Sequence, residues 1–175
     1  GIQSIEDSSF QNLTNLLILY LENEKITSLN RNMFNGIDKV ERLSLKGNIF
    51  DKIENETFIY LKNLKELSFD NGQIKNVYSN AVSYLKSLNK LSFYNNKINL
   101  LKSGVFENLT RLTSLNLELN LIKVIEKNSM PGNDNILIVL NLKKNKLEFI
   151  KEYHFANLYY LQELYLSSNQ ISSIE

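Results

Sequence analysis

Leucine recurs along the chain at an almost constant interval. Leu19, Leu43, Leu67, Leu91, Leu115, Leu140 and Leu164 are separated by steps of 24, 24, 24, 24, 25 and 24 residues. A period of this length predicts one small structural unit stacked on copies of itself, because a single unit cannot bury its apolar face alone. We therefore expect one solenoid rather than a chain divided into domains.

Within each unit, the spacing of apolar residues changes from two to a longer interval. In the fourth unit, Leu91 and Phe93 alternate with the polar positions Lys90, Ser92 and Tyr94. Successive side chains of an extended strand point to opposite faces, so this alternation places the leucine and the phenylalanine inside the coil. Each unit should contribute one strand of about three to five residues to a parallel sheet.

The aligned units share the pattern L-x-x-L-x-L-x-x-N-x-L-x-x-L-x-x-x-x-F-x-x-L-x-x. One unit carries it as Leu88, Leu91, Phe93, Asn96, Ile98, Leu101, Phe106 and Leu109. The pattern resembles the leucine-rich repeat family, in the typical 24-residue subclass found in Toll-like receptor ectodomains, Slit proteins and secreted insect immune proteins. The resemblance implies an α/β solenoid, with a curved parallel β-sheet on the concave face and loops and short 3-10 or extended segments on the convex face.

We expect a single solenoid over residues 1–175, with about seven strands and no cap at either end. The chain begins in the second half of a repeat, at Gly1-Ile2, and stops midway through another, at Ser172–Glu175. Because solenoids need terminal units with a polar outer face, we interpret the sequence as a segment of a longer array. End-to-end association of chains is the alternative.

Two columns of residues should stabilise the coil. The asparagines Asn48, Asn96, Asn120, Asn145 and Asn169 follow the strands. Their amides can bond to backbone groups of their own turn and the neighbouring turn. A second column should stack as an aromatic spine; it contains Phe10, Phe34, Phe58, Phe106 and Phe155, with Val82 and Met130 as replacements.

Three places depart from the pattern. Glu24 and Gly72 stand where asparagine is expected. Burial of a carboxylate is costly, so we expect Glu24 to turn outward or to meet a cation such as Lys25 or Lys46, and Gly72 to lose one bond of the column. The fifth unit is one residue longer and contains Met130–Asn135; this segment should bulge from the convex side without breaking the sheet.

The composition narrows the range of functions. The chain has 20 Lys plus Arg and 19 Asp plus Glu, so no large net field attracts nucleic acid or an acidic membrane. It has no cysteine, which excludes a disulfide framework and a thiol nucleophile. No apolar run approaches the roughly 20 residues of a membrane-spanning helix. The spacing of oxygen ligands in the fifth unit matches no calcium loop, and we expect no metal and no cofactor.

Catalysis is not expected either. His154 is the sole histidine, and it precedes Phe155 on the convex path, far from the outward serines of the strands. Carboxylates such as Glu66 and Asp70 occur on one strand, but no nucleophile, base and pocket converge with them. We therefore predict that the protein is not an enzyme.

Partner binding is expected on the outward positions of the strands. The central outward column contains Ser44, Ser68 and Ser92, which we call the serine trough, and tyrosines near each end. Exposed tyrosines are frequent hot spots of binding, and charges beside them select partners. The predicted concave-face residues are Ile18, Tyr20, Glu22, Arg42, Lys46, Glu66, Asp70, Lys90, Tyr94, Glu118, Val139, Lys143 and Tyr165.

Asn12, Asn55 and Asn108 each begin an Asn-x-Thr triplet, the acceptor sequence for N-glycosylation. Glycans there should project from the return side or an edge of the coil and leave the sheet clear. Chance accounts for about as many triplets in so Asn-rich a chain, so they support secretion only weakly.

The resemblance implies a non-catalytic protein-recognition module of an extracellular receptor or secreted innate-immune protein. Its partner would be a protein ligand or co-receptor, with no nucleic acid and no direct membrane insertion, and the chain could form homo- or hetero-oligomers. Two alternatives remain open: an intracellular scaffold or regulatory subunit in the cytoplasm, and a cell-adhesion protein that assembles laterally.

Overall fold

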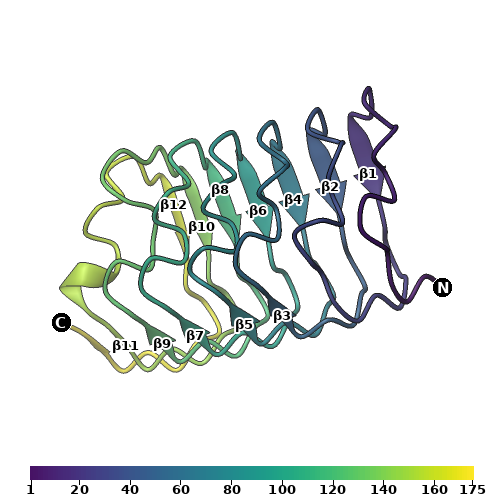
Figure 1. The fold of residues 1–175 in the computed structure, drawn as a ribbon. Helices are drawn as coiled ribbons and strands as arrows, with labels where there is room; N and C mark the ends of the chain where they lie inside the picture. Colours follow the sequence, from purple (N-terminus) through teal and green to yellow (C-terminus); the bar gives the residue numbers. More distant parts are fainter.

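A computed structural model describes all 175 residues as one parallel-stranded solenoid (Figure 1). Its main sheet contains seven strands in the order β1-β2-β4-β6-β8-β10-β12, so each strand pairs with the strand of the next repeat. Their bounds are β1 Ile18–Tyr20, β2 Arg42–Ser44, β4 Glu66–Ser68, β6 Lys90–Ser92, β8 Ser114–Asn116, β10 Val139–Asn141 and β12 Glu163–Tyr165. The predicted fold class is confirmed.

The register of the main sheet stacks equivalent residues on one another. Leu43 pairs with Leu67, and Leu67 with Leu91. Leu115 pairs with Leu140 although the repeat between them is one residue longer. The extra residue is therefore taken up outside the sheet. Residues at equivalent positions of the sequence repeat are thus the ones that pair in the sheet.

The return side of the coil carries only short elements. Six two-residue strands pair as β3 with β5, β7 with β9, and β11 with β13. They are β3 Lys52–Ile53, β5 Asn76–Val77, β7 Leu100–Leu101, β9 Val124–Ile125, β11 Phe149–Ile150 and β13 Ser173–Ile174, and the 3-10 helix η1 spans Glu152–His154. None of the helical structure has the length and apolar character that a bilayer crossing requires.

The core is one continuous cluster of 41 buried residues. The repeated leucines lie in it along most of the sheet, with Leu43 only 2% exposed and Leu140 fully buried. Leu19 on β1 is partly buried, and Leu164 on β12 is 39% exposed. Inward-facing strand positions and return-path positions therefore pack into a single apolar interior, as the pattern predicts.

The asparagine column forms a ladder of hydrogen bonds along most of the coil. The Oδ1 of Asn96 accepts from the backbone N–H of Ile74 in the preceding coil, at 3.0 Å. Its Nδ2 donates to the carbonyl of Phe69 at 2.9 Å and to that of Phe93 at 3.1 Å. Asn48, Asn120, Asn145 and Asn169 make the equivalent bonds. Each rung satisfies backbone groups of two coils, which confirms the expected role.

The two departures from this ladder behave differently. Glu24 pairs with neither Lys25 nor Lys46, so the expected cation contact is wrong, and its side chain stays half-buried rather than turning fully outward. Its Oε2 accepts from the backbone N–H of Ile2. A carboxylate oxygen can supply the acceptor half of a rung, and the half-buried position leaves its charge solvated. Gly72 has no side chain to accept from the backbone, and a Cβ there would lie 2.6 Å from Oδ1 of Asn96. One rung is thus missing at Gly72, as predicted.

The aromatic spine follows a different route from the predicted column. Phe34 stacks on Phe58 with ring centroids 5.6 Å apart, but the next contacts run through Phe69 and Phe93, which directly follow β4 and β6. Phe93 then meets Phe106 at 6.3 Å. Val82 has no ring to bridge Phe58 and Phe106, and Phe69 and Phe93 fill that layer instead.

The longer loop of the fifth repeat is closed by a buried asparagine. The Nδ2 of Asn135 donates to the carbonyls of Gly132 and Asn157, and its Oδ1 accepts from the N–H of Leu137. The backbone N–H of Gly132 also donates to the carbonyl of Glu107 at 3.1 Å. These bonds fix the loop to the repeats on both sides, and the sheet beside it stays intact.

Candidate functional site

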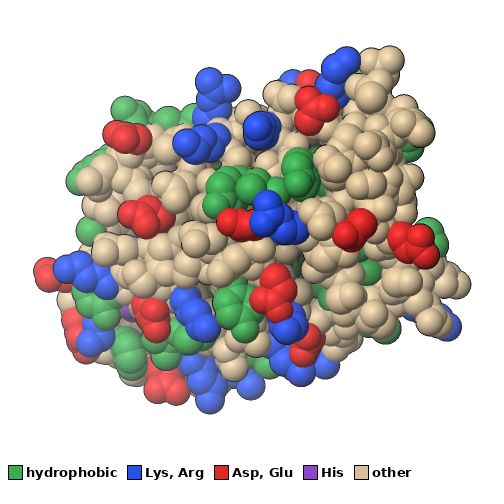
Figure 2. All heavy atoms as spheres, in the orientation of Figure 1, with side chains coloured by type: hydrophobic (Ala, Val, Ile, Leu, Met, Phe, Trp, Pro, Cys, Tyr) green, Lys and Arg blue, Asp and Glu red, His purple; other side chains and the backbone are tan.

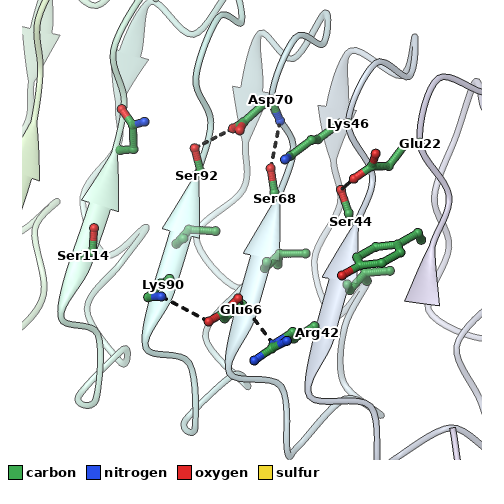
Figure 3. A pocket seen from close by; sticks show the side chains of 15 residues that line it. Glu22, Arg42, Ser44, Lys46, Glu66, Ser68, Asp70, Lys90, Ser92 and Ser114 are labelled. Carbon is green, nitrogen blue, oxygen red and sulfur yellow. Dashed lines mark hydrogen bonds and ion pairs between the residues drawn. The ribbon is translucent and has the colours of Figure 1, made fainter. Parts of the chain in front are cut away.

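The outward residues of the first five strands of the sheet line a shallow concave hollow (Figure 3). Its wall contains the serine trough, Ser114 and Asn116, flanked on either side by charged residues. Leu43, Leu67 and Leu91 form part of the lining, and each is almost fully buried. The hollow therefore has small polar side chains at its centre and an apolar, well-packed layer immediately below.

Serines of the trough bond diagonally to carboxylates of the preceding strand. Ser44 Oγ donates to Glu22 Oε1, and Ser92 Oγ donates to Asp70 Oδ1, each at 2.5 Å. Asp70 Oδ1 also accepts from the backbone N–H of Tyr94 at 3.1 Å. Charge-assisted hydrogen bonds of this kind hold a carboxylate in one orientation. Glu22 and Asp70 are thus pre-oriented along one margin of the hollow.

The opposite margin is formed by three charged side chains on neighbouring strands. Glu66 lies between Arg42 and Lys90, with its Oε2 3.6 Å from Arg42 Nε and its Oε1 3.2 Å from Lys90 Nζ. Figure 3 shows the three in a row across β2, β4 and β6. The cationic side chains are more than half exposed, and exposed pairs of this kind contribute only about 0–1 kcal/mol to stability. They remain free to exchange partners.

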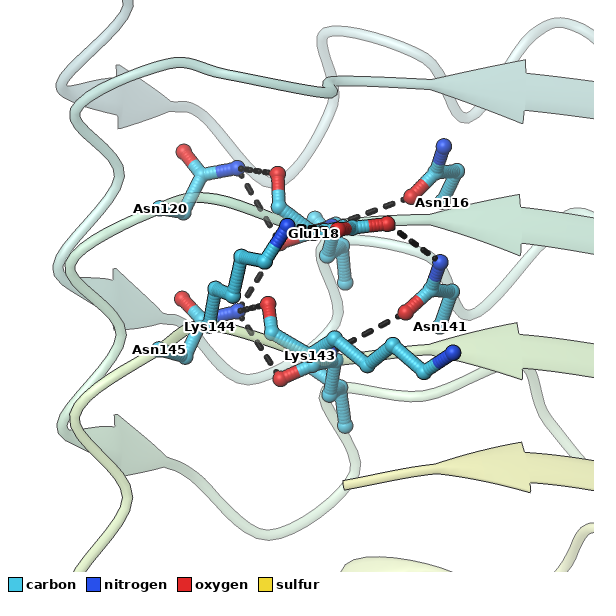
Figure 4. Close-up of polar contacts among 9 residues, drawn as sticks. Asn116, Glu118, Asn120, Asn141, Lys143, Lys144 and Asn145 are labelled. Atoms are coloured by element: carbon cyan, nitrogen blue, oxygen red, sulfur yellow. Dashed lines mark hydrogen bonds and ion pairs between the residues drawn. The ribbon is translucent and has the colours of Figure 1, made fainter. Parts of the chain in front are cut away.

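The sheet beyond the hollow carries a second polar cluster, centred on Glu118 (Figure 4). Its carboxylate contacts Lys144 Nζ at 3.1 Å and accepts from Asn141 Nδ2 at 3.0 Å. The bond and charge of Lys144, followed by the Asn141 bond and the charge of Lys143, outweigh desolvation and lower the pKa of Glu118. The glutamate therefore stays ionised on this face over the whole neutral range.

Tyr165 and its neighbours end the concave row on β12. Its hydroxyl donates to Glu163, and this bond to a carboxylate raises the pKa of Tyr165. Lys143 Nζ lies 4.3 Å from the centroid of the Tyr165 ring, a cation–π contact between β10 and β12. The ring is thereby held in place by a hydrogen bond at its tip and a cation over its face.

The structure brings some of the predicted residues together and separates others. Those that line the hollow are Tyr20, Glu22, Arg42, Lys46, Glu66, Asp70 and Lys90. Tyr20 is 64% exposed at its edge. Those that lie elsewhere on the same face are Ile18, Tyr94, Glu118, Val139, Lys143 and Tyr165. The predicted residues thus share one sheet face, and the hollow lies in its N-terminal part.

Two features of this face were not predicted. The alignment of repeats shows which residues share a column, but not that Ser44 and Ser92 bond diagonally to carboxylates. Lys144, the partner of Glu118, lies in the turn after β10 and has a positive φ of 54°. The equivalent position of other repeats holds Asn23, Asn71 and Asn95, among others. The lysine at this position was therefore the available sign in the sequence of a contact with Glu118.

His154 lies apart from the outward serines. It is buried against the return side, where its Nδ1 accepts from the backbone N–H of Lys151 at 3.2 Å. Its ring packs edge-on against Tyr153 and Phe155. Burial, followed by the positive charge of Lys151, lowers the pKa of His154. No three His, Asp or Glu side chains lie together in a metal-binding arrangement.

The three Asn-x-Thr triplets lie away from the hollow. Asn12, Asn55 and Asn108 are exposed, and none of them lines the hollow. The surface shown in Figure 2 carries lysines, arginines and carboxylates interspersed, with no broad field of one sign. Polar recognition by such a surface depends on local charge pattern rather than on net charge.

The sequence matches the leucine rich repeat family over residues 1–50, 38–98 and 137–175, which together make up most of the chain. The chain belongs to the leucine-rich repeat family. No curated protein matches it. The asparagine ladder and the leucine register described above are thus those of a leucine-rich repeat solenoid.

Several solved structures contain a similar leucine-rich repeat solenoid. A chain of the glycosylated Drosophila Toll–Spatzle complex is 23% identical with a TM-score of 0.86, over 98% of this chain and 24% of that chain. A chain of the LRIM1/APL1C complex is 24% identical, with a TM-score of 0.71, over 99% and 34%. A chain of the TLR13–ssRNA13 complex is 22% identical, with a TM-score of 0.60, over 97% and 34%.

At these identities the likeness concerns the fold. The chain spans about a quarter to a third of the length of these three matched chains. Two of them are complexes between proteins and one is a complex with RNA, according to their descriptions. Repeat surfaces of this family therefore differ in their partners, and the partner of this chain has to be argued from its own residues.

Proposed function

We propose that this protein is a non-catalytic recognition module of an extracellular receptor or secreted innate-immune protein, and that it binds a protein partner through its concave face. The face spans seven strands, about 29 Å at about 4.8 Å per strand. A patch of this width can supply the roughly 800 Å² per partner of an ordinary protein interface. We propose the whole of residues 1–175 as one such module.

The observation that carries this proposal is the balanced charge of the hollow. Arg42, Lys46 and Lys90 alternate there with Glu22, Glu66 and Asp70. Nucleic acid recognition relies on an excess of cations that neutralise phosphates. The three cations of this hollow are balanced by three carboxylates, so it has no such excess. A protein partner, which presents both signs, suits it better than RNA does.

A cross-linking experiment tests the site and the class of partner together. A photo-reactive amino acid is placed at Ser68, at the centre of the trough, and in a matched variant at Lys123, which is exposed beside β9 on the return side. The expected result is a discrete protein adduct from extracellular fluid at Ser68 that excess unmodified protein competes away. An RNA adduct, or an adduct at Lys123 alone, would contradict the proposal.

Extracellular location is proposed from the exposure of Asn12, Asn55 and Asn108. Glycans at these positions would leave the concave hollow open, because none of the three lines it. Natural material should lose mass on treatment with a peptide N-glycosidase, and Asn-to-Asp conversion should map to these sites. Natural protein that carries no glycan at any of the three favours the intracellular scaffold instead.

A further inference from the structure

Charge on the concave face changes sign at every strand. It is carried by the two outward positions that flank the central column, one at the start of each strand and one just beyond its end. At these positions carboxylates occur on β1, β4, β8 and β12, and cations on β2, β6 and β10. The carboxylates are Glu22, Glu66, Asp70, Glu118 and Glu163, and the cations are Arg42, Lys46, Lys90 and Lys143. No charged residue at either position breaks the alternation.

Cross-strand ion pairing explains only one of the two rows. Parallel strands in register favour opposite charges on neighbours, and the row of Arg42, Glu66 and Lys90 is paired in this way. In the other row, Lys46 forms no ion pair with Glu22 or Asp70, although it lies between them. The charge of Lys46 therefore adds no ion pair to the sheet, and it remains available to a partner.

The spacing of the stripes selects the geometry of what binds. Neighbouring strands are about 4.8 Å apart, so a complementary surface needs charges that change sign at about that interval. One turn of an α-helix rises about 5.4 Å, and residues three or four apart share one face. A tilt of about 25–30° from the solenoid axis shortens the projected turn to the strand spacing. A helix of about 20 residues would span the seven strands.

Extended chains fit the stripes less well. In a strand, side chains on one face recur at about 6.7 Å, so a tilt of about 45° would be needed to bring them into step with the stripes. Over the seven strands this tilt would carry the chain sideways by about 29 Å, roughly twice as far as the tilted helix. A polyproline II segment recurs at about 9.3 Å on one face, so it meets only every second stripe. Of the regular backbone conformations, the α-helix places one side chain opposite each strand with the smallest tilt.

We propose that the concave face binds an α-helical segment of a partner protein whose exposed face carries acidic and basic residues in alternation, three or four residues apart. Acidic residues of the helix would lie over β2 and β6, and basic residues over β4 and β8. The small serines of the trough let the helix approach, and the charges of the two margins set its register. This inference rests on the proposed function, since it names the kind of protein that the same face recognises.

The test uses two synthetic helical peptides of about 20 residues and equal composition. One alternates Glu and Lys every three or four residues along one face; the other has its glutamates in the N-terminal half and its lysines in the C-terminal half. Both arrangements favour the helix, and circular dichroism checks that their helicity is equal. Each is titrated into isotopically labelled protein and followed by amide chemical shifts at low and at high salt.

The alternating peptide should bind at least about ten-fold more tightly than the block peptide, with shifts concentrated on β2, β4, β6 and β8, and the preference should vanish at high salt. Equal affinity of the two peptides, or shifts outside these strands, overturns the proposal. Absence of binding by the alternating peptide at millimolar concentration overturns it as well.

A charge exchange within the protein gives a matched control. Arg42→Glu with Glu66→Arg retains a cross-strand pair but cancels the net charge of β2 and of β4. The exchange should lower the affinity of the protein for the alternating peptide by about five-fold or more. Glu41→Lys with Lys65→Glu exchanges the adjacent ion pair, 2.7 Å long and outside the hollow, and should leave the affinity unchanged.

The two proposals fail in different ways. If Ser68 cross-links to a protein but both peptides bind alike, the face recognises proteins without reading the stripes. The recognition function then stands and the helical inference falls. If the peptide preference appears while Ser68 yields only an RNA adduct, the stripes are real but the function proposed above is wrong.

Discussion

The carboxylate of Glu24 receives the backbone N–H of Ile2 at the place where Asn48 receives that of Ile26. A glutamate thus performs the acceptor half of a rung that five asparagines perform in full. The donor half, the Nδ2 bond to a carbonyl of its own turn, has no counterpart in a carboxylate. The first rung is therefore weaker by one donor than those that follow.

Replacement of Glu24 by Asn should restore the missing donor. The new Nδ2 would lie three residues after the carbonyl of Leu21, the same relation as that between Asn48 and Leu45. We expect the free energy of unfolding to rise by about 0.5–1.5 kcal/mol, measured by urea denaturation. Glu24→Ala, which removes the acceptor, should lower it. A Glu24→Asn variant less stable than the parent would show that the carboxylate does more than accept one bond.

Asn96 should be among the most sensitive polar positions of the chain. Asn96→Leu conserves the volume but leaves the N–H of Ile74 and the carbonyl of Phe69 without their partner. The carbonyl of Phe93 keeps a second donor, Asn120. We expect the free energy of unfolding of this variant, measured by urea denaturation, to fall by about 2–4 kcal/mol. Asn99→Ala, an exposed asparagine three residues on, should change stability by less than about 0.5 kcal/mol.

Gly72 is predicted to resist replacement by the residue that the repeat pattern favours. A Cβ at this position lies 2.6 Å from Oδ1 of Asn96 and displaces the rung to Ile74. Gly72→Ala and Gly72→Asn should each lower the free energy of unfolding by about 1–3 kcal/mol. A double-mutant cycle identifies the cause: in an Asn96→Ala background the cost of Gly72→Ala should largely disappear. A cost that persists there would place the clash elsewhere.

The buried His154 predicts a loss of stability in mild acid. Burial lowers its pKa in the folded chain below the ordinary value near 6.5, so the unfolded chain binds the proton more readily. The contribution of neutral His154 to the free energy of unfolding is therefore fully present above about pH 6.5, and it is lost as the pH falls through the folded-state pKa. The proton also removes the Nδ1 acceptor of Lys151 N–H and adds repulsion from the Lys151 ammonium.

Thermal unfolding at several values between pH 7.5 and pH 5 measures this effect. The Tm of the parent should fall across the interval, whereas that of His154→Met should fall less, since Met33 already occupies the equivalent buried position of another repeat. Parallel curves for the two proteins would mean that other groups carry the acid sensitivity.

The sequence predicted those features that depend on periodicity. The alternation around Leu91 and Phe93 fixed which side chains face inward, and the 24-residue step fixed which residues pair, because parallel stacking leaves one register. Asn96 was predictable for a related reason: only an amide offers both a donor and an acceptor at a turn.

Features that depend on individual side chains were not predictable. The aromatic spine passes through Phe69 and Phe93 because Val82 is too small to bridge its neighbours, a matter of packing volume. The bond from Glu24 to Ile2 depends on the reach of a longer side chain. The hollow was predicted as a trough of serines, but its limits and its diagonal serine–carboxylate bonds arise from rotamers that the pattern does not encode.

The loop of the fifth repeat separates chain length from sheet register. Asn135 clamps it to Gly132 and Asn157, while β8 and β10 pair as if no residue had been added. A label attached to the exposed side chain at position 133 or 134 would meet solvent and leave the clamp at Asn135 in place. This turn is consequently a suitable place to attach an affinity handle or a fluorophore without disturbing the concave sheet.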